Sequence, residues 1–292
     1  MKRLIPIVLS TIVLTGVNVG QSQVPVISES MERAGERVKQ HYIDLQKLAW
    51  TDTIRDQELN PDHTPKGKAR EFAYDMIIRL QEIEERIAPF VIREVSDLKV
   101  ADGKPVKKGT SPKSTDPRAA SVGSIAILMP GPRSRYSFSY AGEADLDGRK
   151  TLIVDMTFPP TTRLPEVKWN DSFRVFGVSR NFELTGISYD KARLWIDAET
   201  FDVLRNEVRS TPFEFSRNEK SKKITFEMTT TVRFKRMSFE NPQESLVVPE
   251  SIEILRTFKG AKGGGVRTLH VFTDYKRFTG ETRIEPLEGL FR

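Results

Sequence analysis

The sequence predicts a mainly β protein of the α+β class: an antiparallel half-open β-barrel or curved meander sheet, with one N-terminal amphipathic helix packed on its apolar face. Two observations support this fold class. Segments in which apolar and polar residues alternate recur along the chain and are joined by short turns, as in antiparallel sheets. One segment near the N-terminus instead repeats its apolar residues with the 3.6-residue period of a helix.

The helical segment spans residues 28–48. Ser28 or Ser30 can cap its first turn, because a serine hydroxyl accepts a hydrogen bond from a free backbone N–H. Apolar residues then follow at steps of three and four and form a single stripe, made of Met31, Ala34, Val38, Tyr42 and Leu45. Because the opposite face is charged, we expect the stripe to lie on the apolar face of the sheet.

Strand patterns follow the helix. Apolar residues occupy most second positions of two segments, namely Phe72, Tyr74, Met76, Ile78 and Leu80 in the first and Ile224, Phe226, Met228, Val232 and Phe234 in the second. This alternation is typical of strands with one buried face. Turn residues predict three hairpins, at residues 135–158, 193–209 and 251–278. Strands that succeed one another through short turns favour an antiparallel meander.

Residues 1–22 have the layout of a secretory signal peptide. Lys2 and Arg3 precede an apolar run, and the small residues Gly20 and Ser22 suit a signal peptidase. The competing interpretation is a membrane anchor that is retained, but the apolar core is short for a span of about 20 residues. We therefore expect a cleaved signal peptide and a periplasmic or secreted protein.

The mature part, residues 23–292, is expected to form a single β-rich domain. Residues 107–121 are polar, contain two prolines and have no large apolar side chain. Such a composition is typical of a connecting segment rather than of a strand, so we predict a mobile loop at 107–121. The patterns on either side of this loop are alike, which favours one domain with a long insertion.

Composition excludes several kinds of chemistry. The chain has no cysteine, so disulfides, thiolate catalysis and sulfur-ligated metals are excluded. Loss of residues 1–22 removes two of the 46 basic residues and none of the 40 acidic residues, which leaves a net charge of +4. This charge is mild and no recognition helix accompanies it, so nucleic-acid binding is not expected. Weak attraction to anionic lipid head groups is compatible with it.

No catalytic or metal-binding pattern is present in the sequence. His41, His63 and His270 have no metal-ligand spacing, and we interpret them as solvated or incidental. Asp155 interrupts an otherwise apolar strand, but alternation places it in solvent between Val154 and Met156. We therefore predict a protein without catalytic residues, metal or cofactor.

The candidate binding residues are apolar. Large side chains predicted on the inner faces of strands are Trp50, Phe72, Tyr74, Met76, Trp195, Phe226 and Met228. They fill a packed core or line a cavity for an apolar ligand, and the same residue types serve both arrangements. The sequence leaves both interpretations open.

One hairpin resembles a known family. Residues 193–208 read RLWIDAETFDVLRNEV and follow a signal peptide, an amphipathic helix and antiparallel strands. This order resembles the periplasmic lipoprotein-carrier superfamily of LolA-, LolB- and RseB-like proteins. The residues that carry the resemblance are Trp195, Ile196, Asp197, Glu199, Thr200, Val203 and Leu204. The resemblance implies a half-open β-barrel with a helical lid, which holds lipid chains or signals envelope stress.

Two function classes follow from these patterns. The first is an exported envelope binding protein that holds a hydrophobic ligand (a lipid, an acyl chain or a lipidated peptide) in a half-barrel cavity, so its partner is a hydrophobic small molecule or an acylated protein. The alternative is a non-catalytic structural or interaction protein of the envelope that pairs through exposed strand edges. A cavity beneath the helix favours the first, and a filled core with a long bare edge strand favours the second.

Overall fold

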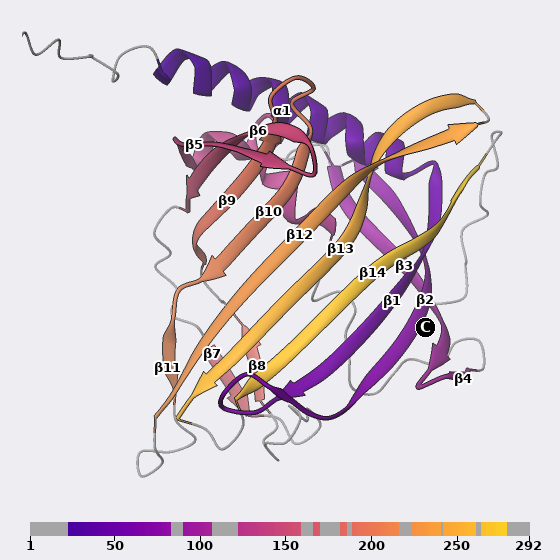
Figure 1. Cartoon of the computed structure of the whole chain (residues 1–292), viewed down its shortest axis with the longest axis vertical. Coiled ribbons are helices and arrows are strands. Elements are labelled where there is room, and N and C mark those ends of the chain that lie inside the picture. The colour runs from indigo at the N-terminus through magenta and orange to yellow at the C-terminus, as the bar shows by residue number, and fades with distance from the viewer. Residues whose placement is uncertain are drawn as a thin grey trace, which may run out of the picture.

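The computed structural model describes residues 23–82, 90–106, 122–158, 166–169, 182–185, 189–215, 223–240, 242–260 and 264–278. The predicted signal peptide, residues 1–22, and the predicted mobile loop, residues 107–121, lie outside these ranges. Most of the described residues belong to strands, and one long helix precedes them (Figure 1).

The described elements follow the order of the chain. They are α1 (Gln23–Leu45), β1 (Leu48–Leu59), β2 (Pro65–Glu82), β3 (Phe90–Ala101), β4 (Lys104–Pro105), η2 (Val122–Leu128), η3 (Pro132–Arg135), β5 (Ser137–Leu146), β6 (Arg149–Thr157), β7 (Glu166–Trp169), β8 (Phe182–Thr185), β9 (Tyr189–Asp197), β10 (Val203–Ser210), β11 (Phe213–Phe215), β12 (Ile224–Glu240), β13 (Gln243–Lys259) and β14 (Gly265–Arg277).

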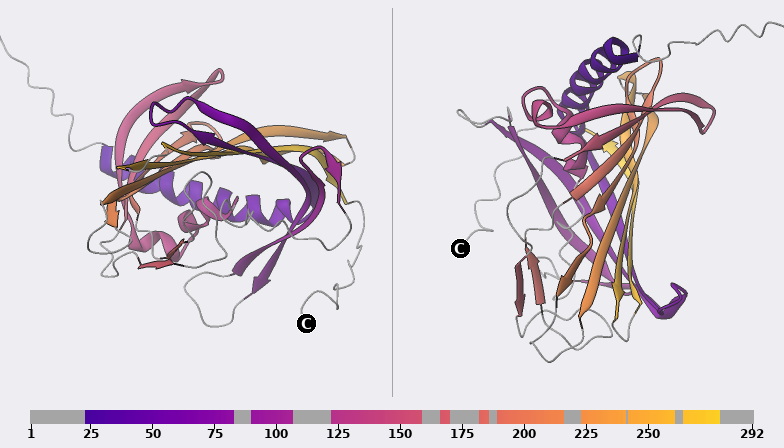
Figure 2. Two further views of the ribbon diagram at one scale, coloured as in Figure 1. Left: turned by 90° about the horizontal axis from the view of Figure 1, so that it is seen from below. Right: turned by 90° about the vertical axis from the view of Figure 1, so that its left-hand side faces the viewer.

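Twelve of these strands form one antiparallel sheet, in the order β4-β3-β2-β1-β14-β13-β12-β10-β9-β6-β5, with β11 paired to β12. The pairing of β1 with β14 brings the first and last strands together in the middle of the sheet. The sheet is curved, and among the described strands its two edges, β4 and β5, do not pair with each other, so it is half-open (Figure 2). The mainly β, antiparallel prediction is confirmed.

Tight Asp-Gly turns connect two pairs of neighbouring strands. Asp102 and Gly103 join β3 to β4, and Asp147 and Gly148 join β5 to β6. All four residues have positive φ, between 49° and 79°. Two successive left-handed residues match the twist of a two-residue hairpin, which explains the Asp-Gly pair in both turns.

Helix α1 crosses one end of the sheet and covers the inner face at that end only (Figures 1 and 2). Its predicted stripe is buried, with exposed fractions of 0–2 % from Met31 to Leu45. The predicted bounds were wrong, because the helix begins at Gln23 and ends at Leu45. Ser30 lies inside the helix with its side chain buried, so it does not act as a cap.

Buried side chains form two apolar clusters on the inner face of the sheet. The larger cluster, here named the α1 core, joins the stripe of α1 to the sheet, and its largest fully buried members include Tyr42, Leu45, Leu48, Ile54, Phe72, Ile78, Met156 and Leu194. The smaller cluster lies where β11 meets β12, at the opposite end from α1 (Figure 1). Within the described ranges, none of the helices is both long and apolar enough to cross a membrane.

Candidate functional site

The α1 core contains four of the seven predicted binding residues. Trp50 lies on β1, and Phe72, Tyr74 and Met76 lie on β2, all with exposed fractions of 5 % or less. These side chains belong to the same cluster as the stripe of α1. At this end of the sheet the predicted binding residues are packed against the helix as a core, which by itself favours the interaction protein over the carrier.

Two further predicted residues, Phe226 and Met228, lie at the other end of the inner face. Phe226 belongs to the smaller cluster, here named the aromatic cluster: Phe213, Phe215, Ile224, Phe226, Met228 and Phe258. Its ring lies 5.3 Å, centroid to centroid, from the rings of both Phe213 and Phe258. Phe226 is fully buried, whereas Phe213, Phe258 and Met228 are half-buried. The cluster is therefore an apolar patch with a partly accessible rim.

The seventh predicted residue, Trp195, lies on the other face of the sheet, and its predicted inward position was wrong. On β9 the buried positions are those of Leu194 and Ile196, and Trp195 between them is half-buried beneath the guanidinium of Arg205, which lies 4.3 Å from its ring centroid. The smaller aliphatic residues take the inner face here because they pack into the α1 core. The indole instead forms a cation–π contact on the outer face.

Polar side chains, here named the polar belt, interrupt the apolar inner face of the sheet: Asp52, Asp56, Arg256, Thr268 and His270. Asp52 and His270 lie among the side chains of the α1 core, and Arg256 lies beside the aromatic cluster. The imidazole Nδ1 of His270 donates to the Asp52 carboxylate over 2.9 Å, and both side chains are 3 % exposed or less. His270 is thus buried and paired, which corrects its interpretation as solvated. The position of Asp52 on the apolar side of β1 was the sequence signal for this pair.

Arg256 is the cation of the polar belt. It is half-buried, and its Nη1 donates to the hydroxyl of Thr268 over 3.1 Å. Burial lowers the pKa of Arg256, and the negative charge of Asp56 offsets part of this shift. An arginine side chain nevertheless stays protonated at physiological pH, so a positive charge lies on the inner face of the sheet.

The other two histidines lie in different surroundings. His41 is buried on α1, and its Nδ1 donates to the carbonyl of Val247 over 3.1 Å. Burial lowers the pKa of His41 to about 4, so the ring is neutral at neutral pH. This corrects its interpretation as a solvated residue. His63 lies in the exposed turn between β1 and β2, with a φ of 66°.

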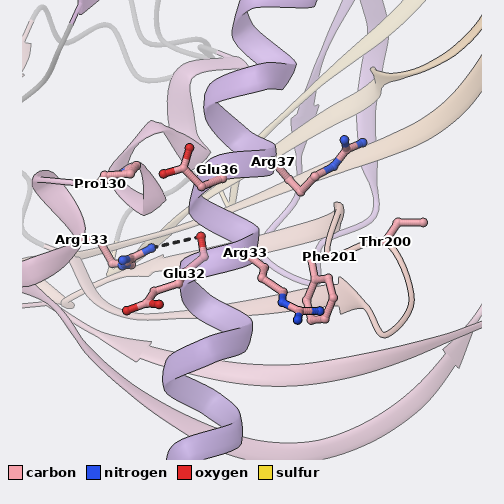
Figure 3. Close-up of a pocket in the computed structure, with 8 residues that line it drawn as sticks. All are labelled: Glu32, Arg33, Glu36, Arg37, Pro130, Arg133, Thr200 and Phe201. Atoms are coloured by element: carbon pink, nitrogen blue, oxygen red, sulfur yellow. Dashed lines mark hydrogen bonds between the residues drawn. The ribbon is translucent and has the colours of Figure 1, made fainter.

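A groove of about 530 Å³ runs over the exposed face of α1 (Figure 3). Arg133 lies on one side of the helix and Arg33, Phe201 and Thr200 on the other. Nη1 of Arg133 donates to the carbonyl of Met31 over 2.7 Å, and the guanidinium of Arg33 lies 4.9 Å from the ring centroid of Phe201. The groove therefore marks contacts that hold α1 from both sides.

Asp202 completes the attachment of α1. Its buried carboxylate forms ion pairs with Arg37 of α1, over 2.8 Å, and with Arg236 of β12. The hydroxyl of Thr200 also donates to it over 2.9 Å. A further close contact lies across the helix, where a Cβ added at Gly35 would come within 2.5 Å of the Leu128 carbonyl oxygen. These contacts fix α1 against the sheet.

The hairpin that carries the family resemblance is the one that provides Asp202. Its turn is built on Asp197, whose carboxylate accepts hydrogen bonds from the backbone N–H groups of Glu199 and Thr200. Burial raises the pKa of Asp197, but these bonds and the Arg149 guanidinium outweigh it and lower the pKa below its usual value. The residues of the resemblance thus shape the turn that holds α1.

Asp155 lies on the outer face of β6, opposite to the buried side chains of Val154 and Met156, as alternation predicts. Arg193 donates to both of its carboxylate oxygens, over 2.6 and 2.9 Å. This bidentate pair keeps the pKa of Asp155 below its usual value. Among the described residues, no group of three His, Asp or Glu side chains has the arrangement of a metal site.

Comparison with known proteins found neither a matching family model nor a matching curated protein. Solved structures are similar over 87 % of this chain and 94 % of theirs. They include a DUF1329 family protein from Desulfovibrio piger (10 % identity, TM-score 0.38), a LolA superfamily protein from Nitrosomonas europaea (12 %, 0.32) and an outer membrane lipoprotein-sorting protein domain from Vibrio parahaemolyticus (14 %, 0.38).

MucB of Pseudomonas aeruginosa, in complex with MucA, is similar over 85 % of this chain with 8 % identity and a TM-score of 0.22. The structural neighbours thus include the LolA superfamily that the hairpin resembles. Because the identities and TM-scores are low, these similarities carry no argument about function. A function has to be inferred from the two apolar clusters and the polar belt.

Proposed function

We propose that this chain is an exported envelope protein that holds a hydrophobic ligand, such as a lipid, an acyl chain or a lipidated peptide, on the inner face of its half-open sheet. The observation that carries the proposal is the aromatic cluster, whose rim residues Phe213, Phe258 and Met228 are half-buried. Covering apolar surface of this kind contributes about 25 cal/mol per Å² before the costs of ordering the ligand.

The two clusters have different roles in this proposal. Phe226 and Met228 contact the ligand, because the rim of their cluster is accessible. Trp50, Phe72, Tyr74 and Met76 support the wall, because they are packed in one cluster with the stripe of α1. The contacts of Asp202, Arg133 and Gly35 keep α1 in place and favour this division.

Location and partners follow from the same proposal. The predicted signal peptide directs the chain to the periplasm or outside the cell, where a carrier meets lipids and acylated proteins. Its work is binding rather than catalysis. A hydrophobic small molecule or the acyl chain of a protein is the partner.

The test is native mass spectrometry of the protein purified from the periplasm, with lipid extraction from the same sample. Wild type is expected to carry a lipid or acylated peptide that Met228→Asp loses, because a carboxylate on the rim opposes an apolar ligand. Val271→Asp is the matched control, since Val271 is 38 % exposed on the outer face of β14. A ligand-free wild type that also binds no fluorescent fatty acid contradicts the proposal.

A second candidate function rests on the edge strand β5. Its ten residues, Ser137–Leu146, pair with β6 on one side and are the last of the described strands on the other. An open edge can accept an extended segment of another protein as an additional strand. Hydrogen exchange that slows at residues 137–146 when an envelope extract is added supports this function, and unchanged exchange there contradicts it.

A further inference from the structure

Arg256 lies next to the aromatic cluster on the inner face. In the ladder between β12 and β13, Arg256 pairs with Met228, and Phe258 pairs with Phe226 two residues further along. Two residues along a strand span about 7 Å, so the guanidinium is within reach of a molecule that lies on the phenylalanine rings. A positive charge therefore borders an apolar patch.

Two polar residues from neighbouring strands interact with this guanidinium. Thr268 of β14 accepts its Nη1–H, and the negative charge of Asp56 on β1 acts on it. A guanidinium has five N–H donors arranged in a planar fork. Among the described residues, the side-chain hydrogen bond of Arg256 is the one to Thr268, which leaves further donors for a ligand.

We propose that Arg256, held by its hydrogen bond to Thr268, binds the carboxylate of a fatty acid whose hydrocarbon chain lies on the aromatic cluster. This inference rests on the proposed function and names the ligand class. A carboxylate is planar and accepts two parallel N–H bonds from one arginine. A single aromatic cluster next to a single guanidinium matches a ligand with one hydrocarbon chain and one anionic end.

Three ligands with the same chain test the proposal on the wild-type protein: dodecanoate, 1-dodecanol and dodecyl phosphate, each titrated by isothermal calorimetry. Dodecanoate is expected to bind at least about tenfold more tightly than the uncharged alcohol, as a charge-assisted hydrogen bond implies. Dodecanoate is also expected to bind more tightly than dodecyl phosphate. Tighter binding of the phosphate overturns the carboxylate assignment.

Substitutions of Arg256 test whether this side chain binds the ligand's carboxylate. Arg256→Gln is expected to bind dodecanoate and dodecanol equally, while its affinity for dodecanol stays near that of wild type. Arg256→Lys keeps the positive charge but lacks the planar fork of N–H donors. Its preference for dodecanoate over dodecanol is expected to lie between those of wild type and Arg256→Gln. Arg267→Gln is the control, because Arg267 of β14 is exposed and paired with Glu253. An unchanged preference in Arg256→Gln overturns the role of Arg256.

The outcomes separate this inference from the proposed function. If wild type binds dodecanoate and dodecanol equally, the headgroup site is wrong and the apolar carrier remains. If wild type binds none of the three ligands, both are wrong for acyl chains. Should Arg256→Gln not fold, the preference of wild type for the acid over the alcohol still decides the question.

Discussion

The two apolar clusters on the inner face of the sheet differ in what covers them. The α1 core is covered by helix α1. The helix is held in place by the Arg37–Asp202 ion pair, by the hydrogen bond from Arg133 to the Met31 carbonyl and by the close approach of Gly35 to Leu128. The aromatic cluster lies at the end away from that helix, and half of its members are half-buried. Strands with the same alternation therefore build a filled core at one end and a partly accessible patch at the other.

The difference teaches that an apolar face becomes a core only when another element is fixed on it. Asp202 and Arg37 are far apart in the sequence and come together only because the β9–β10 turn lies beside α1. The aromatic cluster is instead bordered by the charge of Arg256. Long-range contacts of this kind distinguish the filled α1 core from the aromatic cluster, which we propose as the binding surface.

The largest loss of stability is expected from a substitution in the filled α1 core. Ile252→Ala removes a fully buried side chain of β13, and the free energy of unfolding should fall by about 2–5 kcal/mol. Met228→Ala at the half-buried rim should cost about 1 kcal/mol, because less surface is lost. Urea denaturation followed by circular dichroism measures both. Equal losses would remove the distinction between the two clusters.

Acid should weaken the α1 core through His41. Burial lowers the pKa of His41 from 6.5 to about 4, so between these values the unfolded chain binds more protons than the folded one. Stability is therefore lost as the pH falls through this window, by about 2–3 kcal/mol at about 1.4 kcal/mol per pKa unit.

His41→Gln should show a smaller loss of stability between about pH 7.5 and about pH 4.5 than wild type, measured by urea denaturation at both values. His63→Gln, in the exposed turn, is the matched control and should keep the wild-type profile. A His41→Gln profile that matches wild type would show that His41 does not contribute to the acid sensitivity.

The attachment of α1 is tested at its closest contact. Gly35→Ala places a Cβ 2.5 Å from the carbonyl oxygen of Leu128, so the helix must shift, at a cost of about 1–3 kcal/mol. Hydrogen exchange should quicken in α1 and η2 and stay unchanged in β11. Glu36→Ala, on the exposed face of the same helix, should change stability by less than about 0.5 kcal/mol. Faster exchange in β11 would mean that the two ends are coupled.

The smallest expected effect is on the outer face. Arg193→Ala breaks the bidentate pair with Asp155, yet both side chains are more than a third exposed. Exposed pairs contribute about 0.2–1 kcal/mol, so the urea midpoint should move only slightly, and less at high salt. A loss as large as that of Ile252→Ala would show that the outer face carries part of the core.

Local patterns were sufficient to predict the fold class. Alternation in residues 72–80 and the stripe from Met31 to Leu45 identify inner faces correctly, because burial of one face imposes the period. Trp195 was misplaced because size does not decide which of two neighbouring apolar residues points inward. His41 and His270 were misread because their partners, Val247 and Asp52, are more than 200 positions away in the chain.

The proposed binding site was predictable only in part. Phe226 and Met228 carry a strand pattern that marks them as inward-facing, but the same pattern marks the support wall. Nothing in the local sequence marks Arg256 as a binding residue. Its neighbours Met228 and Val266 lie on other strands, and only the register of the three strands places them beside it. Cross-strand register therefore supplies the information that local patterns lack.

The most direct test of the central claim is photo-crosslinking with a fatty acid that carries a diazirine on its chain, followed by peptide mapping. If the ligand lies on the aromatic cluster, the label should appear on residues 213–215 and 224–228. It should be absent from residues 48–54 and 72–78 beneath α1. A label concentrated beneath α1 would contradict the account and would make the helix, rather than the rim, the gate of the half-barrel.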